Sequence, residues 1–190
     1  MSRQIGLKDI HIAVMTKDDS IEATYQTPVK LERAISARVS PRVTSENIYS
    51  DDTVEDVISS FEGIEVEIET NQLSLDSRAK LQGAKIVKGV LIESKDDIPP
   101  TIAIGFRSKK SNGKYRYVWL LKGKFELSSD EYDTEGEKPQ PKTAKLNGTF
   151  FARDFDGNFR FIADEDALDI DPTIISSWFT SVPDEPVETP

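Results

Sequence analysis

A long stretch of regular alternation, YRYVWLLKGKFEL from Tyr115 to Leu127, limits what this chain can fold into more than any other feature. Its odd positions are apolar or aromatic apart from Gly123, and residues two apart share one face of a β-strand. At about 3.3 Å per residue the strand would extend roughly 40 Å, about twice an ordinary strand. We therefore predict a bend or bulge at Gly123, which has no side chain to pack. Because Val118 and Leu120 make the even face apolar too, we expect a second sheet or another subunit to cover the centre of the strand.

Other strands are predicted on both sides of this stretch. The dipeptide Asn112-Gly113 is a strong hairpin signal, so the strand before it should pair antiparallel with the central one. A second tight turn, Phe155 to Asn158, separates the last two strands. The alternating or apolar segments are residues 8–15, 28–39, 63–70, 88–94, 101–110, 144–154 and 159–166.

Two short helices are also predicted. Ser74 is a typical N-cap for the first, and Gly83 a typical stop. Asp171 caps the second, with Pro172 in its first turn. The expected buried sides are Leu75, Ala79 and Leu81 in the first helix and Ile174, Ile175, Trp178 and Phe179 in the second. The fold class is therefore mainly β with a short flanking helix, in one domain over residues 1–180, followed by a flexible acidic tail over 181–190.

Residues 41–63 lose any period and carry polar clusters interrupted by isolated apolar side chains. A structureless stretch of this length inside a compact domain is uncommon and tends to be functional or ordered by a partner. Two interpretations stay open, a loop folded on its own domain and an arm that reaches a neighbouring subunit. The candidate contact residues of the arm are Ile48, Tyr49, Val54 and Val57.

Composition excludes several classes of function. A formal net charge of −10 repels phosphate, which argues against conventional nucleic-acid binding. The absence of cysteine rules out a disulfide scaffold, a thiolate metal site and a cysteine nucleophile. The first residues lack a secretory apolar core and no apolar run approaches the ~20 residues that span a bilayer, so we expect synthesis as a soluble cytoplasmic product. With 37% hydrophobic and 31% charged residues the core fraction is small, and oligomerisation would compensate for it.

No residue pattern predicts catalysis or a cofactor. The lone histidine, His11, has no serine–aspartate context that would point to catalysis and receives no role. The spacing of Asp154, Asp156, Asn158 and Glu165 resembles a calcium loop, but Phe159 stands where that loop needs glycine, so a hairpin turn is the better interpretation.

Glu65, Glu67 and Glu69 form an acidic stripe on one face of their strand, opposite apolar residues that must be buried. A single flat strand cannot converge three carboxylates on a metal or a substrate. The stripe must face either an internal channel or the outside, and the sequence leaves both open.

The segment YVWLLKGKFELSSDEYDTEGEKPQPKTAKLNGTFFARDFDGNFRF, residues 117–161, resembles the major tail proteins, or tail tube proteins, of long-tailed bacteriophages infecting Gram-positive bacteria. The shared features are the LLKGKFEL strand, the polar link with GEKPQP, and the KLNGTFFAR strand that ends in a small hairpin. GLKDIHIAV, YQTPVKLERAISARVSP and EVEIETNQLSLDSRAKLQG agree more loosely with the earlier strands and helix.

This resemblance implies a tail-tube β-sandwich or barrel that assembles into hexameric rings, whose inner sheets join into one continuous barrel around a lumen. Stacked rings form the non-contractile tail of a virion, and DNA passes through the lumen without specific binding. The implied partners are other copies of the chain, a tape measure protein inside, and tail terminator and distal tail proteins at the ends. No enzyme activity and no cofactor are implied. Glu65, Glu67 and Glu69 are then candidates for the lumen wall.

Two alternatives remain from the sequence. The tube could belong to a contractile particle or a phage-derived bacteriocin. In another class of function, Tyr115, Tyr117 and Trp119 could form the stacking platform of a carbohydrate-binding β-sandwich.

Overall fold

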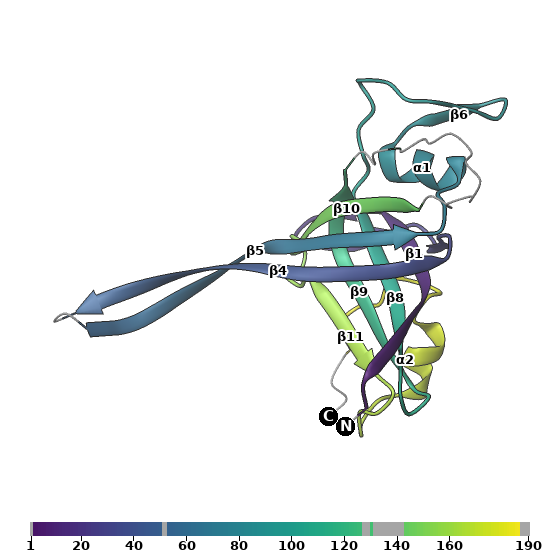
Figure 1. Ribbon diagram of the computed structural model, residues 1–190. Coiled ribbons are helices and arrows are strands. Elements are labelled where there is room, and N and C mark those ends of the chain that lie inside the picture. Colours follow the sequence, from purple (N-terminus) through teal and green to yellow (C-terminus); the bar gives the residue numbers. More distant parts are fainter. Residues whose placement is uncertain (1, 51–52, 127–129, 131–142, 187–190) are drawn as a thin grey trace, which may run out of the picture.

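The computed structural model describes residues 2–50, 53–126, 130 and 143–186 of the chain, with only the backbone for 49, 50, 54 and 55. A curved antiparallel sheet forms the body, and one long hairpin projects far from it (Figure 1). Two short helices and a separate two-stranded hairpin lie beside the sheet. Both described chain ends lie at the lower end of the body in Figure 1. The predicted class, mainly β with short flanking helices, is confirmed.

The main sheet has nine strands in the order β2-β1-β8-β9-β10-β5-β4, with β3 paired to β1 and β11 paired to β9. A separate sheet contains β6 and β7. Each pairing is antiparallel. The strands are β1 (Gln4–Asp18), β2 (Ala23–Tyr25), β3 (Val29–Lys30), β4 (Ala34–Ser50), β5 (Thr53–Thr70), β6 (Lys85–Val87), β7 (Val90–Ile92), β8 (Ile102–Lys110), β9 (Tyr115–Phe125), β10 (Ala144–Phe151) and β11 (Arg160–Asp164).

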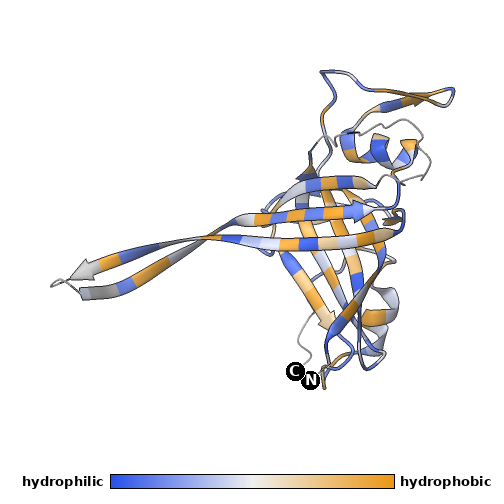
Figure 2. Ribbon diagram, viewed as in Figure 1, coloured by the Kyte–Doolittle hydropathy of each residue, from blue (hydrophilic) through white to orange (hydrophobic). Residues whose placement is uncertain are grey.

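Strand β9 is buried on both faces, as its sequence predicts. Val118 and Leu120 belong to the larger core cluster, with side chains of β1, β5, β8 and β10. Tyr117, Trp119 and Leu121 belong to a second cluster on the opposite face. The expectation that a second sheet or another subunit covers the strand is wrong on this face, because the second cluster is completed by the C-terminal segment of the same chain, which contains helix α2 (Pro172–Ser177). Alternating hydrophobic and hydrophilic residues are visible along the strands of the sheet in Figure 2.

The predicted irregularity near Gly123 is also present. Ile102 pairs with Gly123 and Ile104 pairs with Leu120, so β9 has an extra residue in this interval. A Cβ atom on Gly123 would lie 2.4 Å from the ring of Phe150. The glycine therefore allows Phe150 to pack directly on the backbone of β9.

Both helix starts agree with the sequence. In α1 (Leu75–Gln82), the Ser74 hydroxyl accepts a hydrogen bond from the Ser77 amide, and Gly83 ends the helix in the left-handed conformation. The Asp171 carboxylate caps α2 by accepting from the Thr173 amide. Leu81 is buried and Ala79 half-buried, but the prediction for Leu75 is wrong, because its side chain is exposed at the first position of the helix.

The prediction of a structureless loop over 41–63 is wrong for the described residues. They continue β4 and β5 as one antiparallel ladder that runs from Ala34 and Thr70 to Ser50 and Thr53. Beyond Arg42 both faces of this ladder are exposed. Backbone hydrogen bonds do not require a buried face, so strands formed there without the alternation that a half-buried strand shows.

Two predicted connections also differ. The strand expected over 28–39 is broken into β3, which pairs with β1, and β4, which pairs with β5. The turn after β10 is present, with the Gly157 amide donating to the carbonyl of Arg153. It does not close a hairpin, however, because β10 and β11 both pair with β9 along the same edge. One edge of β9 pairs with two strands, β10 and β11, and the sequence gives no signal of which strand pairs with which half of that edge.

The tail expected over 181–190 begins in contact with the body. Val182 is buried in the second core cluster, so the expectation of a free tail is wrong at this residue. Residues 187–190 lie outside the described residues. Within the parts that the structure describes, no helix is long and apolar enough to cross a bilayer.

Candidate assembly surfaces

The acidic stripe lies on β5 in the body of the sheet. Ile64, Val66 and Ile68 are buried, as predicted, while Glu65 and Glu67 are exposed and Glu69 is half-buried. Glu69 accepts hydrogen bonds from the hydroxyls of Thr143, at 2.6 Å, and Ser36, at 3.4 Å. The stripe therefore lies on the solvent-exposed face of β5, and the opposite face of the strand packs in the main core.

The register of the sheet places cationic side chains among these carboxylates. Arg38 of β4 lies opposite Glu67, and Lys145 of β10 lies opposite Glu69. Arg42 forms an ion pair with Glu65. The charged face, as we call this surface, contains Glu65, Glu67, Glu69 and Glu126 together with Arg38, Arg42, Lys124 and Lys145. The three glutamates share one face of β5, as the sequence predicts, but the bases beside them were missed, because they come from strands that are distant along the chain.

The second surface is the outer hairpin, residues 43–61 of β4 and β5, which extends away from the body (Figure 1). Each of its residues with a described side chain is exposed. Among them are Val43, Ile48, Val57, Ile58 and Phe61. Ile48 and Val57 belong to the predicted contact set, whereas the side chains of Tyr49 and Val54 lie outside those described. An arm with this much bare apolar surface is typical of a contact with another chain.

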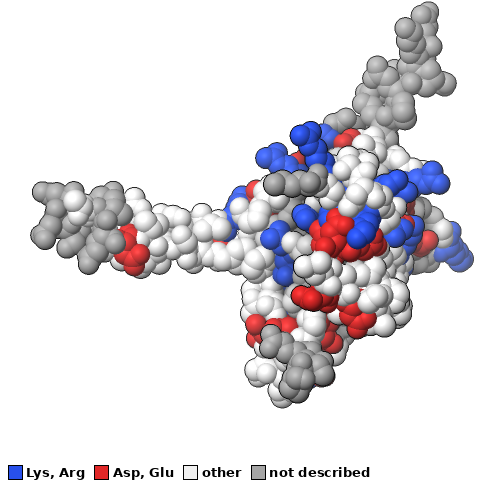
Figure 3. All heavy atoms as spheres, turned by 90° about the horizontal axis from the view of Figure 1, so that it is seen from below, with Lys and Arg blue, Asp and Glu red and all other residues white. Residues whose placement is uncertain are grey.

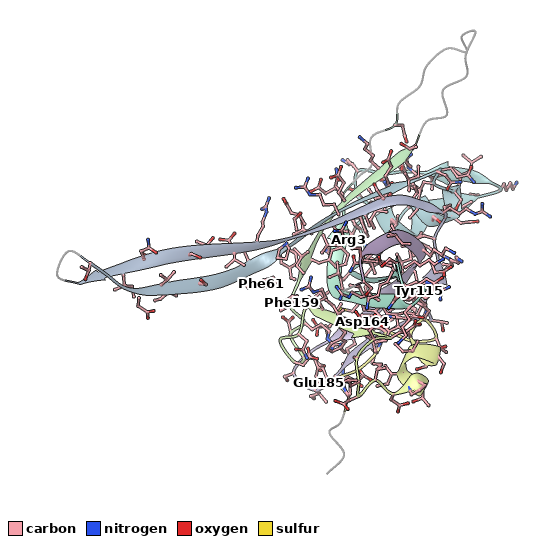
Figure 4. All side chains as sticks on the ribbon, turned by 60° about the horizontal axis from the view of Figure 1, so that its bottom comes forward. Arg3, Phe61, Tyr115, Phe159, Asp164 and Glu185 are labelled. Atoms are coloured by element: carbon pink, nitrogen blue, oxygen red, sulfur yellow. The ribbon has the colours of Figure 1, made fainter. Side chains whose placement is uncertain are left out.

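The base of the outer hairpin is fixed to the body. Phe61 stacks on Phe159, with ring centroids 4.4 Å apart and an angle of 20° between the ring planes. Figure 4 shows the two rings where the hairpin leaves the sheet. A bulge opposite Arg42 and Val43 adds a residue to β5, next to Gly63. Gly63 has a φ of 147°, and a Cβ atom there would lie 2.9 Å from the carbonyl oxygen of Phe150. The direction of the arm is thus set by a stacked pair and a glycine that packs against β10.

The sheet also has strand edges without a ladder partner. In the described part of the chain, β4 pairs only with β5, and β11 pairs only with β9. β4 is 17 residues long. A long open edge exposes a row of amide and carbonyl groups that can pair with another chain.

A further exposed surface was missed by the sequence analysis, which predicted one strand over 88–94. The chain instead turns at Lys88-Gly89, both with positive φ, and pairs β6 with β7. Two adjacent left-handed residues are the requirement of a tight hairpin turn. The signal is weak in the sequence because lysine, unlike asparagine, seldom marks such a turn.

The side chains that the sequence analysis considered for metal binding or catalysis make contacts within the fold instead. Asp156 pairs with the buried Arg153, Asp154 pairs with Lys122 at 2.9 Å, and Glu165 accepts from the hydroxyl of Tyr117 at 2.9 Å. These carboxylates point to separate partners, and no group of metal-binding side chains occurs among the described residues. His11 stacks on Phe179 at 4.4 Å, and its burial lowers the pKa of the imidazole.

A buried cation joins the β8–β9 hairpin to the end of β11. Lys110 forms ion pairs with Asp164 and Asp166, and Arg116 also pairs with Asp164. Burial alone would lower the pKa of Lys110, but its hydrogen bonds to the two carboxylates raise it. Because the charged groups of this network pair with one another within the chain, we interpret the network as structural.

The chain matches no protein-family model, and no curated protein sequence matches it either.

Proposed function

We propose that this protein is a tail tube subunit of a long-tailed bacteriophage, which polymerises into stacked hexameric rings. The observation that carries the proposal is the outer hairpin, whose exposed apolar side chains need a cover from another copy. The resemblance of residues 117–161 to tail tube proteins supports it independently. The proposal includes a tape measure protein in the lumen, terminator and distal tail proteins at the ends, and DNA that passes through.

The open strand edges suit such an assembly. A ring in which β4 or β11 pairs with a neighbouring copy would remove its free edge, and a sheet that closes around a ring has none. The curved sheet would then form part of a continuous barrel, with the tube lumen on its inner side.

Of the two alternatives, the carbohydrate-binding module lacks its platform. Trp119 is completely buried and Tyr117 is 5% exposed, so neither ring can stack on a sugar. An inner tube of a contractile particle or bacteriocin stays open as the second candidate.

The decisive measurement is electron microscopy of the purified protein, with light scattering over a range of concentrations. We expect rings or smooth tubes at high protein concentration, and chelators should leave them intact because no metal is required. A species that is monomeric at all concentrations and salts would refute the proposal. Tubes within a sheath in the native particle would indicate the contractile alternative.

We further propose that the acidic stripe lines the lumen. Changing Glu65, Glu67 and Glu69 to lysine would leave Glu126 as the one carboxylate of the charged face as defined above, so the face would become strongly cationic. A cationic wall holds DNA by counterion release. Phage with this triple substitution should release DNA more slowly than wild type at low salt, with recovery as salt rises.

The matched control changes Asp96, Asp169 and Asp184, three exposed carboxylates away from the stripe, to lysine. It adds the same charge and should release DNA normally. Normal release from the stripe variant at low salt would place the stripe on the outside of the tube.

A further inference from the structure

The β6–β7 hairpin has one face without a partner. Its register pairs Lys85 with Ile92 and Val87 with Val90, so these four side chains share a face, which we call the β6–β7 face. Val87, Val90 and Ile92 are 51%, 61% and 50% exposed. A lone two-stranded hairpin is marginally stable in water, and α1 contacts only part of this one. The β6–β7 face is therefore a surface that gains stability when it is covered.

The outer hairpin has a face that also carries apolar side chains, with charges of opposite sign. Glu46 lies opposite Ile58, and Ile48 lies opposite Asp56 in the ladder, so these four side chains share one face. We call it the acidic hairpin face. Among the described side chains the other face is neutral, with Val43, Ser45, Asn47, Val57, Ser59 and Phe61. The two faces of the arm thus differ in charge while both carry apolar side chains.

The charges of the two surfaces complement each other. Lys85 and Lys88 of the small hairpin have no carboxylate partner in the described part of the chain, and neither Glu46 nor Asp56 has a cationic one. Figure 3 shows acidic and no basic side chains on the visible outer part of the long arm. Apolar residues flanked by unpaired charges of opposite sign are the elements of a specific interface.

The two surfaces cannot meet within one copy. The outer hairpin and the β6–β7 hairpin point away from opposite sides of the body in Figures 1 and 4. A contact between two different surfaces of identical chains is heterologous, and repeating it gives a ring or an open filament. This arrangement fits the growth of a polymer rather than the formation of a closed dimer.

We propose that the acidic hairpin face of one copy docks on the β6–β7 face of the next copy. Ile48 and Ile58 pack against Val87, Val90 and Ile92, while Glu46 and Asp56 approach Lys85 and Lys88. This inference rests on the proposed function, since it names the receiving surface for the arm of the tube subunit.

Cross-linking tests the contact directly, because the chain has no cysteine of its own. An Ile58→Cys chain is mixed with a Val90→Cys chain that carries a larger tag, allowed to assemble, and oxidised. We expect a mixed disulfide dimer on a non-reducing gel. The control is Ser59→Cys, the adjacent position on the neutral face, which should cross-link at least about tenfold less because disulfides form only between close Cβ atoms.

Charge reversal tests the electrostatic part. Lys85→Glu with Lys88→Glu should raise the protein concentration needed for assembly by about tenfold or more, and adding Glu46→Lys with Asp56→Lys to the same chain should restore it. Arg3→Glu with Lys8→Glu, an equal charge change at two exposed bases outside the candidate assembly surfaces, should leave assembly near the wild-type concentration.

The outcomes separate this inference from the proposed function. Polymers that form normally but give no Ile58→Cys to Val90→Cys cross-link would overturn the docking contact alone. A wild-type chain that never assembles would overturn both.

Discussion

A chain in which residues 45–59 are replaced by an Asn-Gly turn is expected to fold normally and to form no tubes. Thr44 lies opposite Ser60, so a two-residue turn can close the shortened ladder. The described side chains removed are exposed, and Phe61 and Gly63 at the base are kept. The loss of core packing is therefore small, whereas the arm that we assign to the contact between copies is gone.

The measurement pairs thermal unfolding, followed by circular dichroism, with sedimentation and electron microscopy. We expect an unfolding midpoint close to that of the unassembled wild-type chain and a single monomeric species at concentrations where wild type polymerises. A full-length chain with Ser59→Ala is the control and should form tubes. Tubes of normal length from the shortened chain would remove the outer hairpin from the assembly mechanism.

The features that could be predicted from the sequence are those with local causes. The alternation in β9, the caps at Ser74 and Asp171 and the turn at Asn112-Gly113 each depend on residues within a few positions of one another. The burial of Ile64, Val66 and Ile68 follows from the same alternation.

The features that were missed depend on distant residues or on the absence of burial. The charged face contains Arg38 and Lys145 because β4 and β10 flank β5, and no local pattern indicates that register. The ladder of the outer hairpin has no core side, so it shows no periodicity by which the sequence could reveal it. The candidate contact surfaces are for this reason the least predictable parts of the chain.

The second large effect is expected in the core, where Gly105 of β8 lies under Trp119 of β9. A Cβ atom at Gly105 would lie 2.5 Å from the indole ring. Trp119 is completely buried, and its Nε1 donates a hydrogen bond of 2.8 Å to the carbonyl oxygen of Trp178. The ring cannot move away without breaking this bond and its packing on the C-terminal segment. We therefore expect Gly105→Ala to reduce the free energy of unfolding by about 1–3 kcal/mol.

Trp119→Ala should cost about 3–5 kcal/mol, because it leaves a large cavity and an unpaired carbonyl group. The double substitution should cost less than the sum by about 0.5–3 kcal/mol, since the space left by the indole accommodates the new methyl group. Urea unfolding of the shortened-hairpin chain measures the cost of all three variants, with tryptophan fluorescence as the signal, since Trp178 is present in each of them. Gly6→Ala is the control, because its Cβ would meet nothing closer than 3.7 Å. Additive costs of the two core substitutions would show that the glycine and the indole do not depend on each other.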